Sequence, residues 1–275
     1  MVHHLLKAGH RVTVYARRAE AMAPFVAAGA HAANSPAEAA RDAEFILTNV
    51  TATADVESIL LGAGGVIETA RSGSVICDFS TVDAAATRAI AARLAERGIE
   101  FLDCPVSGGA KGAEAATLTI LVGGSAAALA RAQPLLEKLG KNIFHMGAVG
   151  AGQITKACNQ IVQVVNIQGI AEAMLFAQNN GVDTAKVVDA LMAGMAGSKM
   201  LDLMGRKMAA RDFAAGIEAR LHHKDFGLVR NIAEQQGLPM PAVTVVHEQL
   251  SKLMDHGWGT MDTCNLLRVL EEQQT

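Results

Sequence analysis

Residues 74–109, SVICDFSTVDAAATRAIAARLAERGIEFLDCPVSGG, decide the fold class of this chain. The opening stretch, 74–79, is rich in apolar and β-branched side chains, a composition typical of a buried strand. Alanine-rich periodicity over 83–97 predicts a helix, and Gly98 stands where a helix commonly ends. A second short strand is predicted at 100–103. A strand, a helix and another strand in this order predict a βαβ unit with parallel strands.

The same alternation of strands and helices extends over the first half of the chain. Further short strands are predicted at 12–15, 45–50, 117–122 and 142–145, and a helix at 125–139 begins with a serine cap. This pattern predicts an α/β fold of the Rossmann type, with a doubly wound, mostly parallel sheet. Such sheets bind ligands at the carboxyl ends of their strands.

Beyond about residue 150 the sequence shows helical periodicity and no convincing strand. A helix around 154–177 is apolar over much of its circumference, which is typical of a helix buried between neighbours. Four more helices are predicted at 185–194, 200–208, 224–236 and 242–256. We therefore expect two domains: residues 1–149 bind a dinucleotide, and residues 150–275 form an all-helical substrate and dimerisation domain. The long apolar helices predict a homodimer or homotetramer.

Composition and charge exclude several classes of protein. A net charge of −3 with one Trp and one Tyr argues against a nucleic-acid partner, which needs a basic face. The chain lacks a run of 18 uncharged apolar residues, so we expect no membrane span. The four cysteines are scattered, without a CxxC pair or a histidine at ligand spacing, which predicts neither a disulfide framework nor a metal site. We expect a cytoplasmic protein that acts on a small molecule.

The first residues raise a question about the cofactor site. A helix over 1–8 precedes the strand at 12–15, so the chain begins with the second half of a βαβ unit. In dinucleotide-binding units the glycine-rich loop follows the first strand, about 20 residues before the residue that reads the ribose. No GxGxxG occurs at the required place. This suggests that the chain is truncated at its N-terminus, and it leaves the activity of the chain in this form in doubt.

The residues after the strand at 12–15 bear on the choice of cofactor. The sequence Ala16-Arg17-Arg18 has no acidic side chain to bind a ribose 2′-hydroxyl. Arginine there suits a 2′-phosphate, which favours NADP over NAD, with Arg17 as the candidate ligand. The alternative is a solvated basic turn.

Two further stretches carry candidate chemistry. Ser107-Gly108-Gly109 follows a predicted strand, and two glycines let backbone N–H groups converge on an anion such as a carboxylate; a plain turn is the alternative. Lys156 lies on the long apolar helix, with Asn159 one turn later. Burying an ammonium is costly. Lys156 therefore either reaches solvent or faces a polar cleft that lowers its pKa.

Three separated stretches together resemble the β-hydroxyacid dehydrogenases. DCPVSGGAKGAEAATLTILVGG at 103–124 is similar to their substrate-binding segment. GAVGAGQITKACNQ at 147–160 is similar to their catalytic-lysine helix, and HHKDF at 222–226 to their second lysine segment. The two adjacent histidines in the last stretch point in different directions along a helix, which argues against a metal site there.

The resemblance implies a role for individual residues. Lys156 would be the catalytic residue, Asn159 would orient the substrate, and Ser107, Gly108 and Gly109 would hold its carboxylate. The dinucleotide would be contacted by Arg17, Val50, Thr51, Thr81 and Lys224.

The resemblance also implies a reaction. The expected activity is the NAD(P)H-dependent reduction of a short semialdehyde acid, and residues 193–198 favour tartronate semialdehyde (2-hydroxy-3-oxopropionate), with D-glycerate as the product. The alternatives are 3-hydroxyisobutyrate oxidation and reduction of succinic or glyoxylate semialdehyde. The alternative to an enzyme is a protein without catalytic activity, either an inactive truncated scaffold or a non-catalytic dinucleotide-binding relative. The presence of Lys156 argues against the non-catalytic relative, which would need no proton donor.

Overall fold

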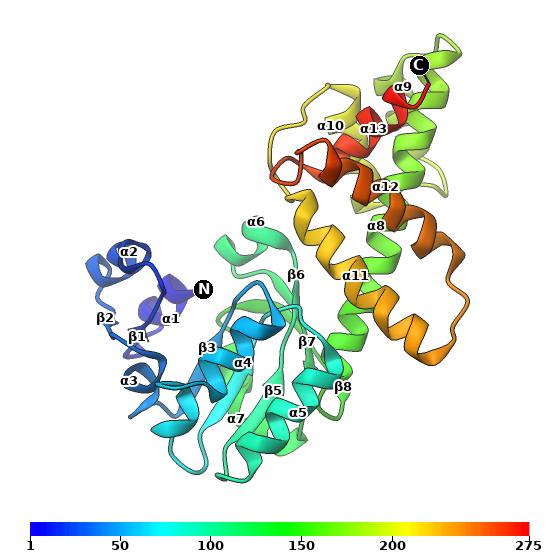
Figure 1. Cartoon of the computed structure of the whole chain (residues 1–275). Coiled ribbons are helices and arrows are strands. Elements are labelled where there is room, and N and C mark those ends of the chain that lie inside the picture. Colours follow the sequence, from blue (N-terminus) through cyan, green and yellow to red (C-terminus); the bar gives the residue numbers. More distant parts are fainter. Residues whose placement is uncertain (275) are drawn as a thin grey trace. The chain divides into compact units, whose positions relative to one another are not determined.

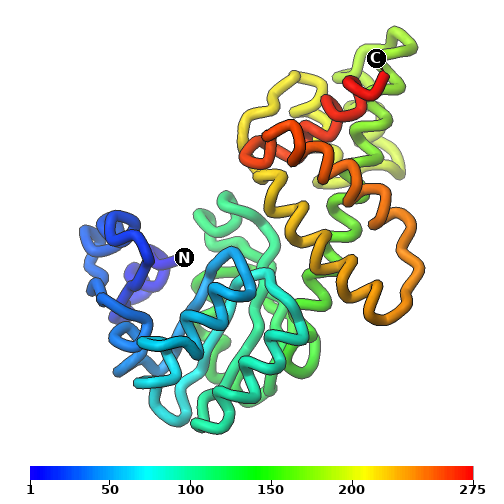
Figure 2. Tube along the Cα trace, in the orientation of Figure 1, coloured from blue at the N-terminus to red at the C-terminus, as the bar shows by residue number. Residues whose placement is uncertain are grey.

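The computed structural model describes residues 1–274, and the chain divides into two compact units. The first unit comprises Met1–Lys156 and the second begins at Ala157. Helix α8 (Ala151–Asn179) begins in the first unit and continues in the second, as Figures 1 and 2 show.

The first unit is built on a six-stranded sheet in the order β3-β4-β5-β7-β6, with β8 beside β7. Strands β3, β4 and β5 are parallel, and their register places Thr48 beside Asp78 and Asp78 beside Asp103. Their carboxyl ends therefore lie side by side, as the sequence predicted. The strands of this sheet are β3 (Phe45–Thr48), β4 (Val75–Asp78), β5 (Glu100–Asp103), β6 (Val106–Ser107), β7 (Leu118–Gly123) and β8 (Gly140–Gly147).

Two features of the sheets differ from a simple parallel arrangement. Strand β7 runs antiparallel to both β5 and β6, and the connection from β6 to β7 contains a short helix, α6 (Gly109–Glu114). Strands β1 (Thr13–Val14) and β2 (His31–Ala32) pair in parallel in a separate two-stranded sheet. The sequence did not predict β2, which has two exposed residues and no apolar run.

Helices cover both faces of the six-stranded sheet (Figure 1). Leu60 of α4 and Leu94 of α5 pack against Ile76 and Phe101 on one face. Leu136 of α7 packs with other residues on the opposite face. Alternate residues of each central strand thus enter two cores. The helices of the first unit before α8 are α1 (Val2–Lys7), α2 (Ala23–Ala27), α3 (Pro36–Ala40), α4 (Thr53–Leu61), α5 (Ala84–Ala95), α6 (Gly109–Glu114) and α7 (Ala126–Leu136).

The second unit is helical and has its own core. Ile167 and Met174 of α8 pack with Phe226 of α11 and Leu250 of α12. Helix α8 is long and apolar enough to cross a membrane by length and composition alone, but its inner face lies in this core. The other helices are α9 (Thr184–Met192), α10 (Arg206–Ala209), α11 (Ala219–Gln236), α12 (Pro241–Asp255) and α13 (Leu266–Glu272), with a π-helical turn at Leu201–Gly205.

Two helix predictions in this unit need correction, and one helix was missed. Helix α11 begins at Ala219 and not at Lys224, because Ala219 and His222 share a buried face with Phe226 and extend the helix toward its N-terminus. The predicted helix at 200–208 is a π-helical turn followed by α10. Helix α13 was not predicted, since it is short and largely apolar, a pattern that does not distinguish helix from strand.

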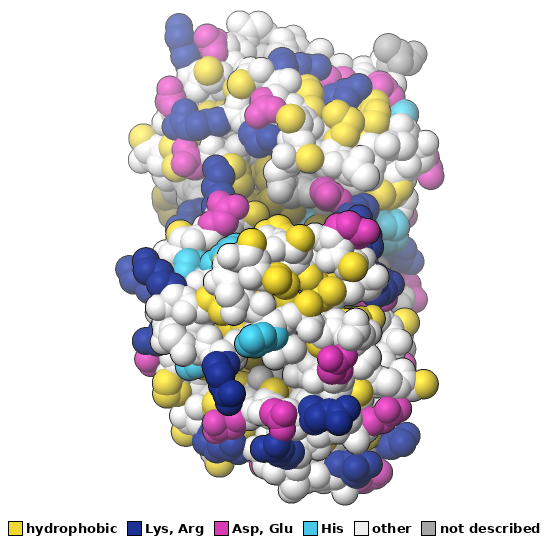
Figure 3. All heavy atoms as spheres, turned by 90° about the vertical axis from the view of Figure 1, so that its left-hand side faces the viewer, with side chains coloured by type: hydrophobic (Ala, Val, Ile, Leu, Met, Phe, Trp, Pro, Cys, Tyr) yellow, Lys and Arg dark blue, Asp and Glu magenta, His cyan; other side chains and the backbone are white. Residues whose placement is uncertain are grey.

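The surface mixes charged and apolar groups. Figure 3 shows Lys and Arg side chains interspersed with Asp and Glu on one face, between groups of hydrophobic side chains. Two large apolar side chains of α8 are exposed in this structure, Val162 at 71% and Phe176 at 73%.

Candidate active site

The carboxyl ends of β3 and β4 meet in a buried hydrogen-bond network. Oδ1 of Asp78 accepts hydrogen bonds from Thr48 Oγ1 at 2.8 Å, Ser80 Oγ at 2.6 Å and the Ser80 backbone N at 3.2 Å. Asp78 Oδ2 is also buried and has no hydrogen-bond partner within residues 1–274. Three donors on one oxygen hold the start of the β4–α5 loop in a single conformation.

This network joins the two loops that carry predicted cofactor residues. The backbone N of Val50, after β3, donates to Ser80 Oγ at 2.9 Å. Thr51 follows Val50, and Thr81 follows Ser80. The structure therefore ties the loop of Val50 and Thr51 to the loop of Thr81 at the edge of the sheet where such folds bind ligands.

Asp103, at the end of β5, anchors the beginning of α8. Its Oδ1 accepts from the Gly150 backbone N at 2.7 Å, and its Oδ2 accepts from the Gln153 backbone N at 2.9 Å. The helix start lies against the sheet so closely that a Cβ on Gly152 would stand 2.4 Å from the Leu121 carbonyl oxygen. Gly152 thus allows the close approach of helix and sheet.

Gln153 adds a second link between α8 and the β4–α5 loop. Its Nε2 donates to the Ser80 carbonyl at 2.8 Å, and its Oε1 accepts from the Val82 backbone N at 3.2 Å. Lys156 follows Gln153 by one turn of the helix and is 8% exposed. Its burial disfavours the alternative in which Lys156 extends into bulk solvent.

Burial acts on the two carboxyl groups of this region. It raises the pKa of Asp78 above its ordinary value of 3.8, although the hydrogen bonds from Ser80 and Thr48 oppose the shift. It likewise raises the pKa of Asp103, against the opposing hydrogen bonds from the backbone of Gly150 and Gln153. In both cases the cost of placing a charge in an apolar interior exceeds the effect of the donors.

The shift at Asp78 predicts an unusual pH dependence of stability. Because the folded-state pKa lies above the unfolded value, the contribution of Asp78 is fully present below about pH 4 and is lost as the pH rises through the folded pKa. Asp78→Asn keeps the accepting oxygen and removes the charge. We expect the free energy of unfolding of this variant to rise relative to wild type between pH 4 and pH 7, measured by urea denaturation. A relative gain of the wild type over the same interval would contradict the expected sign.

Both glycines of the Ser107–Gly109 turn have positive φ. Ser107, in β6, pairs with Thr119 of β7, and the next two residues have φ of +133° and +61°. Both values lie in the region that favours glycine. A Cβ on Gly108 would also stand 3.3 Å from Leu118 Cδ2.

Arg17 lies in the first unit and is exposed. Its Nη1 lies 3.1 Å from Asp55 Oδ1 of α4, and the Arg17 side chain is 78% exposed to solvent. An exposed ion pair of this kind contributes little to stability, so the guanidinium can exchange its partner at low cost.

In the second unit, Asn159 and Lys224 belong to one network. Asn159 Nδ2 donates to Gln160 Oε1 at 2.7 Å, and Gln160 Nε2 donates to Asp225 Oδ2 at 2.7 Å. Lys224 Nζ lies 3.1 Å from the other oxygen of Asp225. Asp225 thus joins two predicted site residues that lie on different helices.

Sequence reasoning missed the residues that hold these sites. Asp78 was assigned only to a strand, and Asp103 stood in the DCPVSGG stretch without a role of its own, although a polar residue that closes a buried strand is a signal for the ligand-binding edge. Asp225 stood in the HHKDF stretch, but its burial on the inner face of α11 follows from packing.

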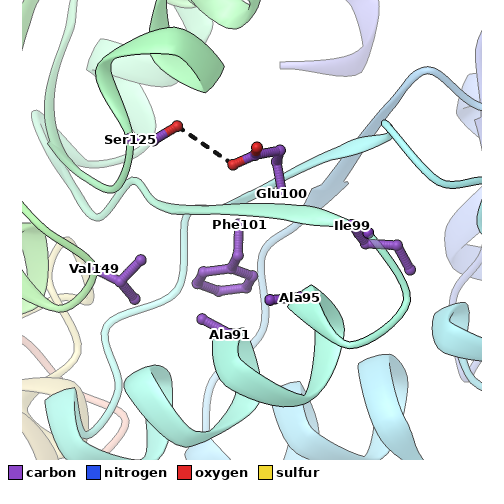
Figure 4. Close-up of a pocket in the computed structure, with 8 residues that line it drawn as sticks. Ala91, Ala95, Ile99, Glu100, Phe101, Ser125 and Val149 are labelled. Carbon is purple, nitrogen blue, oxygen red and sulfur yellow. Dashed lines mark hydrogen bonds between the residues drawn. The ribbon is translucent and has the colours of Figure 1, made fainter.

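The pocket in Figure 4 lies apart from these residues. Phe101 of β5, Ala91 and Ala95 of α5, and Val149 line it, and Ser125 Oγ donates to Glu100 Oε2 at 3.3 Å beside it. It contains none of the predicted site residues, so it is not the candidate active site.

Comparison with known proteins identifies the family of both parts of the chain. A family model described as the NAD-binding domain of 6-phosphogluconate dehydrogenase matches residues 1–147. Another, described as the NAD-binding domain of NADP-dependent 3-hydroxyisobutyrate dehydrogenase, matches residues 150–270.

Individual relatives match almost the whole chain. The 2-hydroxy-3-oxopropionate reductase of Escherichia coli (strain K12) is 36% identical over 98% of this chain and 92% of its own length. An NAD-dependent L-serine dehydrogenase of Pseudomonas aeruginosa is 34% identical over 100% of this chain and 94% of its own. The solved structure of Mycobacterium tuberculosis 3-hydroxyisobutyrate dehydrogenase with L-serine superposes with a TM-score of 0.90. Its sequence identity is 29%, and the match covers 98% of this chain and 94% of that one.

Proposed function

The chain belongs to the 3-hydroxyisobutyrate dehydrogenase family of NAD(P)-dependent β-hydroxyacid dehydrogenases, and from this premise we propose that it reduces 2-hydroxy-3-oxopropionate to D-glycerate. The observation that carries the proposal is the position of Lys156. It is buried on a helix whose first turn is anchored to the carboxyl ends of β4 and β5. The similarity to a 2-hydroxy-3-oxopropionate reductase over nearly the whole chain supports the choice of substrate.

The first unit fits a nicotinamide dinucleotide. Parallel strand ends meet at one edge, two loops are tied together there through Ser80, and Arg17 offers an exposed guanidinium. When bound, the cofactor supplies the hydride. The protein aligns the reactants and stabilises charge.

In the proposed mechanism, Lys156 donates a proton to the aldehyde oxygen of the substrate as that oxygen gains negative charge. The backbone turn at Ser107–Gly109 binds the substrate carboxylate, and Asn159 orients the carbon chain. Val50, Thr51, Thr81 and Lys224 contact the dinucleotide. The first turn of α8 is held by two hydrogen bonds, from the Gln153 backbone N to Asp103 and from the Gln153 side chain to the Ser80 carbonyl. These bonds restrict the position of Lys156 before the substrate arrives.

We further propose that NADP is preferred over NAD because Arg17 binds the 2′-phosphate. Arg17→Ala should raise the Kd for NADPH about tenfold, the effect of losing one charge-assisted hydrogen bond at an exposed site, and leave the Kd for NADH nearly unchanged. Fluorescence titration with both cofactors measures the two constants. Arg71→Ala is the matched control, since Arg71 is also exposed and paired with a carboxylate, that of Asp42. Equal weakening of both cofactors would contradict the role of Arg17.

The substrate is tested by a direct comparison of reactions. The purified protein with NADPH should show its highest kcat/KM for 2-hydroxy-3-oxopropionate, compared with methylmalonate semialdehyde, succinic semialdehyde and glyoxylate. L-serine oxidation, measured with the oxidised cofactor NADP+, should show a lower kcat/KM. A tenfold or greater preference for another compound would replace the proposed substrate. Absence of turnover in folded protein that binds NADPH would favour the non-catalytic alternative.

We also propose that the protein is a homodimer or homotetramer. The exposed Val162 and Phe176 of α8 would be covered by another copy, which would remove their apolar surface from water. Light scattering after size-exclusion chromatography tests this, and a monomer mass would refute it.

A further inference from the structure

The side-chain amide of Gln153 pairs with the main chain on both sides of Thr81. Its Nε2 donates to the Ser80 carbonyl oxygen at 2.8 Å, and its Oε1 accepts from the Val82 backbone N at 3.2 Å. A carbonyl oxygen only accepts and a backbone N–H only donates, so a flipped amide would lose both hydrogen bonds. The peptide group of a neighbouring strand would pair in the same way. Gln153 therefore brackets Thr81 with one donor and one acceptor.

The sheet holds the same loop from its other side. Ser80 Oγ donates to Asp78 Oδ1 at 2.6 Å and accepts from the Val50 backbone N at 2.9 Å. Ser80 and Asp78 are both buried, at 1% and 0% exposed. Ser80 is thus fixed to the sheet by its hydroxyl and to α8 by its carbonyl. Thr81, the next residue, has little freedom to move away from α8.

Gln153 also fixes the helix that carries Lys156. Its backbone N donates to Asp103 Oδ2 at 2.9 Å, and Lys156 follows three residues later on the same side of α8. Gln153 is 3% exposed and Lys156 is 8% exposed. All of these residues belong to the first unit. Close-packed interiors transmit displacements instead of absorbing them, so the distance between Thr81 and Lys156 depends on Gln153.

We infer that Gln153 is a positioning residue that holds Thr81 and Lys156 in one fixed relation, so that one side chain aligns the contact to the dinucleotide with the proton donor. This inference rests on the proposed function, in which Thr81 contacts the dinucleotide and Lys156 donates the proton. Reduction needs the hydride donor and the proton donor to be aligned at the same time, and a displacement of about 1 Å can lower the rate about 100-fold. Asp103 anchors α8 to the sheet, whereas Gln153 makes the alignment of Lys156 depend on the loop that meets the cofactor.

The bracket requires a side chain of this length with one donor and one acceptor. Methionine has a similar length and forms neither hydrogen bond. An ionised glutamate offers only acceptors, one of which would face the Ser80 carbonyl oxygen. A protonated glutamate has one O–H donor and one accepting oxygen, so it can replace the amide. Burial raises the pKa of such a carboxyl group, which brings the change between the two forms closer to neutral pH.

Gln153→Glu gives the first test, because one protein passes from the competent to the incompetent form as the pH rises. At pH 5.5 its kcat should lie within about threefold of wild type at the same pH, since the introduced carboxyl is protonated. By pH 9 the ratio of the two kcat values should fall at least about tenfold, because the ionised carboxyl no longer donates to the Ser80 carbonyl. KM for the substrate should change much less, because its carboxylate is bound at Ser107–Gly109 in the proposed mechanism. A ratio that stays constant over this range would overturn the inference.

Gln153→Met gives the second test, because it removes both hydrogen bonds without adding a charge. Its kcat should be at least about tenfold below wild type at every pH, and its Kd for NADPH should rise about threefold. Gln168→Met is the matched control. Gln168 is a glutamine of the same helix, 4% exposed, whose Nε2 donates to Glu172, and its substitution should leave kcat nearly unchanged.

The kinetic readout separates positioning from folding. A purely structural role would lower Tm in both methionine variants and leave kcat of the folded protein at the wild-type value. The pH comparison of Gln153→Glu keeps the test decisive if Gln153→Met fails to fold, since it follows a single protein. A kcat of folded Gln153→Met within about threefold of wild type would overturn the inference.

The result is also separable from the proposed function. The kinetics use whichever of the compared substrates the protein turns over, so a different preferred substrate would refute the proposed reaction and leave this comparison intact. If the folded protein turns over none of them, the proposed function fails and hydrogen exchange still tests the bracket. The Val82 amide hydrogen should then exchange at least about tenfold faster in Gln153→Met than in wild type. Equal exchange rates would overturn the inference.

Discussion

Lys156→Ala should lower kcat for 2-hydroxy-3-oxopropionate by at least about 100-fold, the usual scale for removing a general acid. Without the ammonium, the aldehyde oxygen gains negative charge with no proton donor beside it. Substrate affinity should change much less, because the carboxylate is bound elsewhere in the proposed mechanism. Steady-state kinetics with saturating NADPH measure the loss.

The controls for this experiment separate chemistry from folding. Lys141→Ala removes an exposed lysine on β8 and should leave kcat within twofold of wild type. Circular dichroism and Tm should confirm that Lys156→Ala is folded. Added small primary amines should restore part of the activity if the missing group is a proton donor. A loss of tenfold or less in folded protein would exclude Lys156 as the general acid.

Asp103→Ala should have the largest effect on stability, lowering the free energy of unfolding by about 2–5 kcal/mol. The substitution leaves the backbone N–H groups of Gly150 and Gln153 buried without their acceptor. It also frees the first turn of α8, so we expect kcat to fall as Lys156 loses its fixed position. Urea denaturation measures the first effect and steady-state kinetics the second.

A graded set of variants makes this prediction specific. Asp103→Asn retains one accepting oxygen and should fall between wild type and Asp103→Ala. Asp42→Ala removes an exposed carboxylate paired with Arg71 and should cost less than about 1 kcal/mol. If Asp103→Ala were as stable as Asp42→Ala, the anchoring of α8 would depend on contacts other than this carboxylate.

Much of the fold was predictable because its signals are local. Alternating strand and helix patterns predicted the sheet of the first unit, and the apolar periodicity around 154–177 predicted α8. Capping residues predicted where single helices begin. Ser125 is the N-cap of α7 as expected, and its side chain accepts a hydrogen bond from the Ala128 backbone N. The errors fell where local patterns are weak, as in β2, α13 and the start of α11.

The sequence by itself determined the fold class, the family and the helix that carries Lys156, since periodicity, glycine positions and motif order are properties of neighbouring residues. Only the tertiary structure decided that Asp103 holds the start of α8, 47 residues away, and that Asp225 of α11 accepts a hydrogen bond from Gln160 of α8. These links depend on strand register and helix packing. A hydrogen bond depends on distances of a few tenths of an ångström between groups far apart in the chain, and no local pattern encodes those distances.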